Sequence, residues 1–252
     1  MKKLMSHLVA NYPTPELSFA VAQALVEGGA DILEVQLPFS DPSADGPAIQ
    51  NACSTVLERG ATTKDGLDFI AKVHKAFPQV KIAIMSYGSL IYTPGVDAFC
   101  KKASEAGVSM MIIPDLPFDC DEGLTEACKK YGMENVPVAA PSMTVERMKK
   151  LLDKGFTTIY AALRAGITGV ATKVDDQTLA FLDRLKKPNK DGNIAQIWGG
   201  FGINGKEQAD AIAPHVEGVI AGSVFVRIIE ANKEDKARMM QLITEKAKEI
   251  KN

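Results

Sequence analysis

The sequence has few cysteines and lacks long apolar runs. Its four cysteines, Cys53, Cys100, Cys120 and Cys128, show neither a CxxC pair nor metal-ligand spacing. This distribution favours reduced thiols over a disulfide framework or a zinc site. No run of about 18 apolar residues is present, and no charged leader followed by an apolar stretch follows Met1. We therefore expect no membrane span, no signal peptide and a cytoplasmic location.

An excess of charge is also missing. The chain has 29 Lys and Arg against 31 Asp and Glu, a net charge of −2, and both signs are mixed along its length. A basic surface for nucleic acid or an anionic membrane is therefore not expected. No Walker motif appears, and His7, His74 and His215 form no cluster that could bind a metal or activate a serine. We expect no nucleic acid, no metal and no cofactor.

Short apolar stretches and helical patterns alternate along all 252 residues. Several helical patterns end at glycine, and no Pro- or Ser-rich linker interrupts them, which predicts one domain, 1–252. Eight such units in about 250 residues favour a closed (β/α)8 TIM barrel, with an open doubly wound sheet as the alternative. The expected strands are 4–10, 32–37, 80–85, 110–113, 135–139, 157–161, 194–198 and 218–221. The expected helices are 15–27, 48–59, 63–76, 96–106, 122–131, 145–154, 176–185, 206–213 and 234–251.

The strand 32–37 has a half-polar pattern and runs into an acidic loop rich in proline. Its alternation puts Leu33 and Val35 on one face and Glu34 on the other. In a barrel the apolar face suits the surrounding helices, so Glu34 should point inward near the mouth, where active sites of this fold lie. Desolvation there favours proton transfer at neutral pH. The alternative is a structural ion pair with an interior Lys or Arg.

Two further side chains are candidates at the same end of the barrel. Asp45 lies in Ala-Asp-Gly-Pro, so a functional carboxylate and a helix N-cap are both open interpretations. Tyr160 shares the inner face of its strand with Thr158, and its hydroxyl could reach the cavity. The alternative for Tyr160 is a buried hydroxyl bonded to backbone.

Glycines follow the last two expected strands. Gly200-Phe201-Gly202 follows the seventh expected strand, and Gly222-Ser223 follows the eighth. Residues 225–229 could supply a short helix. Backbone N–H groups at such glycines approach an oxyanion closely, and a helix N-terminus adds favourable potential. The loops after strands 7 and 8 are the usual phosphate site of this fold, although ordinary tight turns remain the alternative.

Four motifs, LEVQLPFSDPSADGPAIQ, IYAALRAGITG, GGFGI and AGSVFVRIIE, occur in this order and together resemble the tryptophan synthase alpha chain family. The resemblance covers nearly the whole chain. It implies a carbon–carbon lyase that cleaves indole-3-glycerol phosphate to indole and D-glyceraldehyde 3-phosphate in L-tryptophan biosynthesis. It also implies a pyridoxal-phosphate β subunit as partner in an α2β2 assembly, and no cofactor in this chain.

The resemblance assigns roles to individual residues. Glu34 matches the general acid/base, Asp45 the carboxylate that holds the indole N–H, and Tyr160 a hydroxyl near the reacting centre. Phe201 matches an apolar wall for the substrate. Thr168, in the loop after the sixth expected strand, matches the residue that bonds the catalytic Asp when that loop closes. Backbone groups of four residues match the phosphate site: Gly169, Gly202, Gly222 and Ser223.

The chain departs from the family pattern at several places. The usual helix before the first strand is absent from the sequence, so we expect a barrel floor that is closed in another way or is more open. His7 stands where an aromatic wall residue is usual, Asn11 replaces a Gly, Ser43 replaces a Leu, and Leu163 replaces a Ser. These positions bear on the substrate wall, the loop and the subunit contact. A weakly active or inactive homologue that regulates the β subunit is therefore the alternative function.

Overall fold

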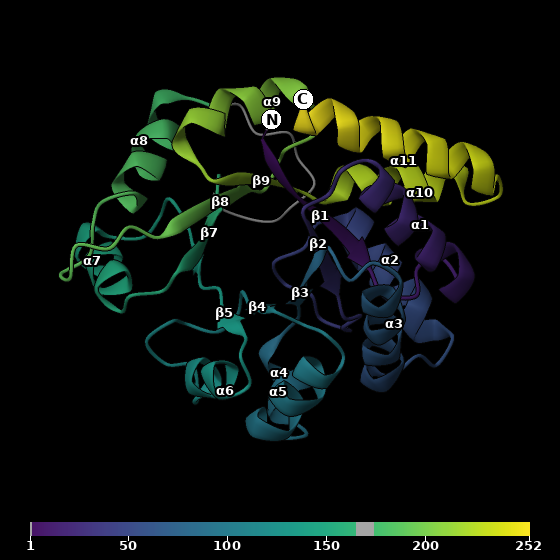
Figure 1. Ribbon diagram of the computed structural model, residues 1–252, viewed down its shortest axis with the longest axis horizontal. Helices are drawn as coiled ribbons and strands as arrows, with labels where there is room; N and C mark the ends of the chain where they lie inside the picture. The colour runs from purple at the N-terminus through teal and green to yellow at the C-terminus, as the bar shows by residue number, and fades with distance from the viewer. Residues whose placement is uncertain (1, 165–173) are drawn as a thin grey trace.

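The computed structural model describes residues 2–164 and 174–252, and its strands form one parallel sheet that curls round on itself (Figure 1). The order in the sheet is β5-β4-β3-β2-β1-β9-β8-β7-β6. The bounds are β1 Lys3–Val9, β2 Ile32–Gln36, β3 Lys81–Met85, β4 Met110–Ile112, β5 Glu134–Asn135, β6 Val138–Ala139, β7 Thr158–Ala162, β8 Gln196–Gly200 and β9 Gly218–Ala221. The predicted TIM barrel is confirmed, with structural neighbours of the same architecture described below.

The fifth expected strand, 135–139, is the place where the barrel closes, and it is divided in two. Its first part, β5, pairs with β4, and its second part, β6, pairs with β7. Between them Val136 N–H donates to Met111 O at 2.8 Å, while Pro137 O accepts from Tyr160 N–H at 3.0 Å. Proline has no N–H for a continuous ladder, so it interrupts the strand. The prediction of one unbroken strand was therefore wrong.

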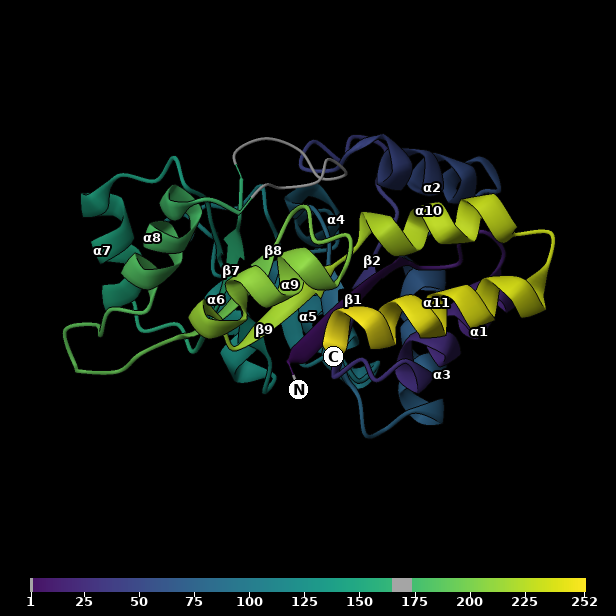
Figure 2. The same ribbon diagram turned by 90° about the horizontal axis from the view of Figure 1, so that it is seen from above.

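The helices lie outside the sheet (Figures 1 and 2). The nine expected helices are present, some with bounds shifted by one or two residues. Helix α4 after β3 was not predicted, and the short helix expected at 225–229 is the longer α10. The bounds are α1 Pro15–Glu27, α2 Pro47–Glu58, α3 Thr63–Ala76, α4 Gly88–Tyr92, α5 Val96–Glu105, α6 Leu124–Lys130, α7 Val145–Asp153, α8 Asp176–Leu185, α9 Lys206–Ile212, α10 Ser223–Asn232 and α11 Lys236–Lys251. A 3-10 helix, Ala213–His215, follows α9.

Local sequence explains where several helices begin. The Thr14 hydroxyl caps α1 ahead of Pro15, which suits the first helical position because it lacks an N–H. Thr62 and Asp65 form a reciprocal capping box at the start of α3.

The first and last helices pack together (Figure 2). The Thr244 hydroxyl of α11 donates to the carbonyl of Ala24 in α1 at 3.0 Å. Near the chain ends, Lys2 N–H donates to Lys251 O at 3.2 Å. The two ends of the described chain therefore lie side by side.

The apolar core has two parts. The larger part lies between the strands and the helices, and the smaller part fills the barrel interior. The interior members are Met5, Ile32, Ala83, Met110, Ile112, Val136, Tyr160, Trp198 and Ile220. Because Ile32 is among them, strand alternation places Glu34 and Gln36 on the same inner face of β2. The apolar interior thus gives way to polar side chains toward the strand ends. None of the described helices is long and apolar enough to cross a membrane.

Candidate active site

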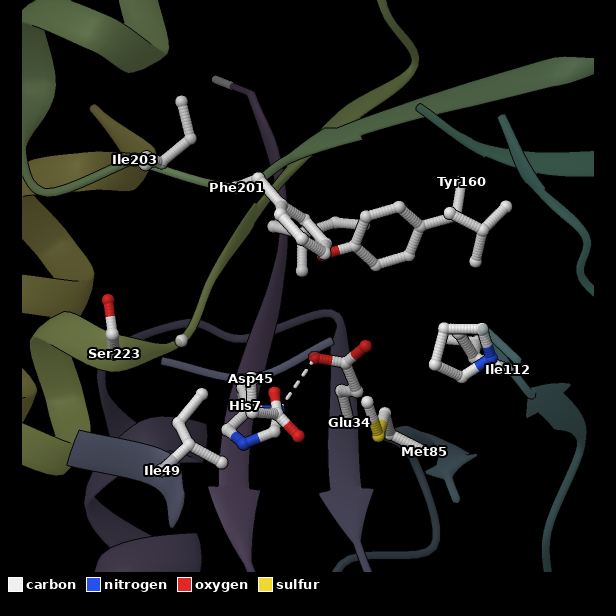
Figure 3. A pocket seen from close by; sticks show the side chains of 15 residues that line it. His7, Glu34, Asp45, Ile49, Met85, Ile112, Tyr160, Phe201, Ile203 and Ser223 are labelled. Atoms are coloured by element: carbon white, nitrogen blue, oxygen red, sulfur yellow. Dashed lines mark hydrogen bonds and ion pairs between the residues drawn. The ribbon is translucent and has the colours of Figure 1, made fainter. Parts of the chain in front are cut away.

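A pocket opens among side chains at the carboxyl ends of the strands (Figure 3). It brings together seven of the residues predicted from the sequence: Glu34, Asp45, Tyr160, Phe201, Gly202, Gly222 and Ser223. The other lining residues are His7, Ile49, Met85, Ile112, Pro114, Val138, Ile203 and Ile220. Polar groups therefore converge in a site whose remaining walls are largely apolar. Such a site is typical of enzymes that bind a small substrate.

Glu34 points inward, as expected, and is only 4% exposed. Its Oε2 lies 2.9 Å from Nδ1 of His7, which is 3% exposed and lies on the adjacent strand β1 (Figure 3). Among the described residues the partner of Glu34 is thus His7 and not an interior Lys or Arg, which was the alternative interpretation. The histidine partner was missed, although the parallel register of β1 and β2 sets His7 opposite Glu34. Alternation in both strands would have placed the two on one face.

Asp45 is 1% exposed and is held by two side chains. Its Oδ2 accepts hydrogen bonds from Gln36 Nε2 at 2.8 Å and from the Tyr87 hydroxyl at 2.7 Å. Tyr87 also accepts from Ala44 N–H at 3.1 Å, which fixes the preceding residue of the loop. The N-cap of α2 is Gly46, with no side-chain cap. The capping interpretation of Asp45 was therefore wrong.

Burial governs the ionisation of this carboxylate. Desolvation raises the pKa of Asp45, while His7 and the hydrogen bonds from Tyr87 and Gln36 act in the opposite direction. Nearby Glu34 contributes a further increase, because two negative charges in one site repel. The pKa of Tyr87 is raised strongly by desolvation and by the Asp45 charge, so Tyr87 stays a hydrogen-bond donor.

Tyr160 and Phe201 form the opposite wall. Their rings meet edge to face, with centroids 5.8 Å apart (Figure 3). Desolvation, followed by the charges of Glu34 and Asp45, raises the pKa of Tyr160 well above its usual value. A β-carbon at Gly200 would come 2.4 Å from the Tyr160 hydroxyl oxygen, so only glycine leaves room for this ring position. The wall thus depends on a glycine that the sequence suggested for phosphate binding.

The predicted anion site lies at the start of α10. Gly222 is its N-cap and Ser223 its first residue, and both line the pocket. Gly202, with φ of +103°, adopts a backbone conformation that favours glycine, and it also lines the pocket. First-turn N–H groups and the dipole of a ten-residue helix suit an anion. Thr168 and Gly169 lie outside the described residues.

Two further polar residues, Asp115 and Asn11, lie outside the pocket lining. Asp115, also at a strand end, accepts from Gly88 N–H at 3.0 Å with Oδ1. Asn11 has φ of +63°, a left-handed conformation that asparagine tolerates better than most residues. Within residues 2–164 and 174–252, no group of three or more His, Cys, Asp and Glu is placed to hold a metal ion.

Comparison with known proteins gives one consistent family. The family model described as tryptophan synthase alpha chain matches residues 1–252. The tryptophan synthase alpha chain of Helicobacter hepaticus is 36% identical over 232 residues, covering 90% of this chain and 85% of the relative. That of Methanosarcina acetivorans is 38% identical over 228 residues, covering 90% and 80%.

Solved structures agree with these relatives. The tryptophan synthase subunit alpha of Legionella pneumophila superposes with a TM-score of 0.85 at 28% identity, covering 99% of this chain and 91% of that one. A chain of Mycobacterium tuberculosis tryptophan synthase gives 0.85 at 30% identity, covering 100% and 93%.

Proposed function

The chain belongs to the tryptophan synthase alpha chain family of carbon–carbon lyases, and from this membership we propose that it cleaves indole-3-glycerol phosphate to indole and D-glyceraldehyde 3-phosphate. This reaction would serve L-tryptophan biosynthesis. The observation that carries the proposal is the convergence of two buried carboxylates, Glu34 and Asp45, with the N-terminus of α10 in one pocket. A carboxylate can accept the N–H of an indole ring, and the N-terminus of a helix can bind a phosphate.

In the proposed reaction Glu34 is the general acid/base. It donates a proton to C3 of the indole ring, which makes the ring an electron acceptor. Glu34 then takes the proton of the hydroxyl on the glycerol carbon attached to C3. The bond between C3 and this carbon breaks, and the electron pair of the bond returns to the ring. The hydroxyl becomes the aldehyde of glyceraldehyde 3-phosphate, and Glu34 ends in its starting protonation state.

Asp45 holds the indole N–H and stabilises the positive charge that develops there when C3 is protonated. The bonds from Gln36 and Tyr87 both end on Oδ2, so we assign Oδ1 to the indole N–H. These two donors fix the carboxylate before substrate arrives. A fixed charge stabilises the transition state without reorganisation at the moment of reaction.

The rest of the pocket would bind the remaining parts of the substrate. Tyr160 places its hydroxyl near the reacting centre, and Phe201 forms an apolar wall. The backbone groups of Gly169, Gly202, Gly222 and Ser223 would take the phosphate. Thr168 would bond the catalytic Asp45 when the loop closes.

The proposed partner is a pyridoxal-phosphate β subunit, which would receive indole within an α2β2 assembly in the cytoplasm. The proline-bounded loop before α2 is the segment that we expect to close on substrate and to touch this partner. Its carboxylate Asp45 belongs to the pocket, so contact with the partner could bear directly on the reaction. The chain itself needs no cofactor for the proposed proton transfers.

Glu34→Gln tests the proposal. It should lower indole formation at least about a hundredfold, because the amide can neither donate nor take up the two protons. Glycerol phosphate binding, measured by calorimetry, should survive. Asp115→Asn is the matched control, since it removes another strand-end carboxylate outside the pocket lining.

Unchanged turnover in Glu34→Gln would exclude this acid/base. A wild-type chain that binds glycerol phosphate and releases no indole would instead indicate the alternative function, an inactive homologue that regulates the β subunit.

A further inference from the structure

We propose that His7 is a positioning residue that sets the carboxylate of Glu34 for proton transfer, an inference that rests on the proposed role of Glu34 as acid/base. His7 occupies a position where the family resemblance leads one to expect an aromatic wall. Its imidazole instead makes a polar contact with the reacting carboxylate.

Neighbouring strands bring the two side chains together. His7 of β1 and Glu34 of β2 are opposite each other in the parallel register, and both face the barrel interior. The 2.9 Å contact joins Nδ1 to Oε2. An ionised carboxylate can only accept, so Nδ1 carries the proton when Glu34 is charged. Oε2 is thereby held on the His7 side, and Oε1 is left to approach the reacting atoms of the substrate.

The surroundings of the ring show that packing alone does not account for a histidine here. Nε2 of His7 is buried and has no hydrogen-bond partner in the described chain. A buried nitrogen without a partner is costly, and an apolar ring at this place would avoid that cost. The contact with Glu34 is the compensating interaction that the structure offers.

The ring is also held from the side of α10. A β-carbon at Gly222 would come 3.2 Å from Cβ and 3.4 Å from Cγ of His7. The glycine at the predicted phosphate site therefore gives His7 the room that it occupies. Asp45 faces the same cluster from the loop before α2, and the interaction with His7 lowers its pKa against the effect of burial. His7 thus interacts with both carboxylates of the proposed reaction.

Two substitutions at position 7 separate positioning from packing. His7→Asn places an amide N–H near the position of Nδ1 but leaves part of the space empty. His7→Phe fills the space and removes the donor. If His7 positions Glu34, His7→Phe should lower kcat about tenfold to a hundredfold with little change in KM, and His7→Asn should keep most of kcat. If His7 only packs, the order of the two variants reverses, and this result would overturn the proposal.

A spectroscopic measurement tests the contact without activity. The Nδ1 proton of His7, buried and bonded to Glu34, should give an imidazole N–H signal protected from exchange in ¹H–¹⁵N spectra. The signal should vanish in His7→Phe and move in Glu34→Gln. His215 is the internal control, because its Nδ1 lies 2.6 Å from Asp183 Oδ1 at an exposed place. His215→Asn should change neither this signal nor indole formation.

The two proposals fail in different ways. A signal that is absent in the wild type, or unchanged in Glu34→Gln, overturns the positioning role even if the enzyme cleaves its substrate. A wild-type chain that shows the signal but releases no indole overturns the proposed function, and with it the role assigned to His7 in the reaction.

Discussion

At the scale of single residues, the pocket is defined by carboxylates whose hydrogen bonds come from other parts of the barrel. Asp45 reaches the pocket from a loop. Of its donors, Gln36 is the last residue of β2 and Tyr87 is the N-cap of α4. Burial raises its pKa despite these donors. The Asp45 anion is therefore less stable in the pocket than a carboxylate in water. At neutral pH this lowers the free energy of unfolding of the protein.

Asp45→Asn should reveal this cost. Because the folded-state pKa of Asp45 lies above its usual value of 3.8, the folded state binds more protons than the unfolded state between the two values. Stability is therefore lost as pH rises through this window. We expect Asp45→Asn to raise Tm at pH 7, to lose that advantage as pH falls toward 3.8, and to lower indole formation. Thermal melts across pH measure this.

Asp65 provides the opposite control. Hydrogen bonds from the Thr62 hydroxyl and from the Thr62 backbone N–H lower the pKa of Asp65 in the capping box of α3. Its stabilisation is present above the unfolded value and is lost as pH falls. Asp65→Asn should therefore lower Tm at pH 7. An Asp45→Asn variant that also loses stability at neutral pH would contradict the account of Asp45.

At the scale of elements, most of the fold follows from local patterns. The bounds of α1, α3 and α8 match those expected from apolar spacing and capping residues. Non-local geometry accounts for the differences. Pro137 divides the closing strand between two neighbours, and α4 is too short to have a helical period that the sequence could reveal.

The same division between local and non-local information holds for the site. Chain direction in a parallel barrel predicted that Glu34, Asp45, Tyr160 and the glycines would meet. The partners of the carboxylates depend on strand register and on side-chain direction across strands, which no single stretch encodes. Because the register was not known, His7 was interpreted only as part of the substrate wall. For the same reason the interpretation of Asp45 was left open between helix capping and function.

The junction of β9 and α10 gives a prediction at this scale. Gly222→Ala should weaken glycerol phosphate binding at least about tenfold, because the methyl group would press on His7 and move the first turn of α10 away from the anion. Calorimetry measures the affinity. Gly60→Ala is the control: its β-carbon meets nothing within 4 Å, and its φ of +77° predicts a loss of stability without a loss of binding. Equal affinities in Gly222→Ala and the wild type would exclude α10 as the phosphate site.

At the scale of the whole molecule, closure of the barrel is what assembles the site. His7 lies near the beginning of the chain and Ser223 near its end, yet both line one pocket because β1 pairs with β9. The ends of the described chain meet at the amino end of β1, where Lys2 N–H donates to Lys251 O. Glu34 and Asp45 come from the β2–α2 unit, whereas Gly222 and Ser223 come from the junction of β9 and α10. The proposed acid/base, indole carboxylate and phosphate site therefore depend on one fold.

Product analysis with the purified wild-type chain tests the central claim most directly. Indole-3-glycerol phosphate is supplied, and indole and glyceraldehyde 3-phosphate are measured together, with and without a β subunit. The account predicts that both products appear in a one-to-one ratio, and that Glu34→Gln lowers the formation of both at least about a hundredfold. Indole-3-glycerol phosphate left intact under both conditions, or indole released without an equal amount of glyceraldehyde 3-phosphate, would contradict it.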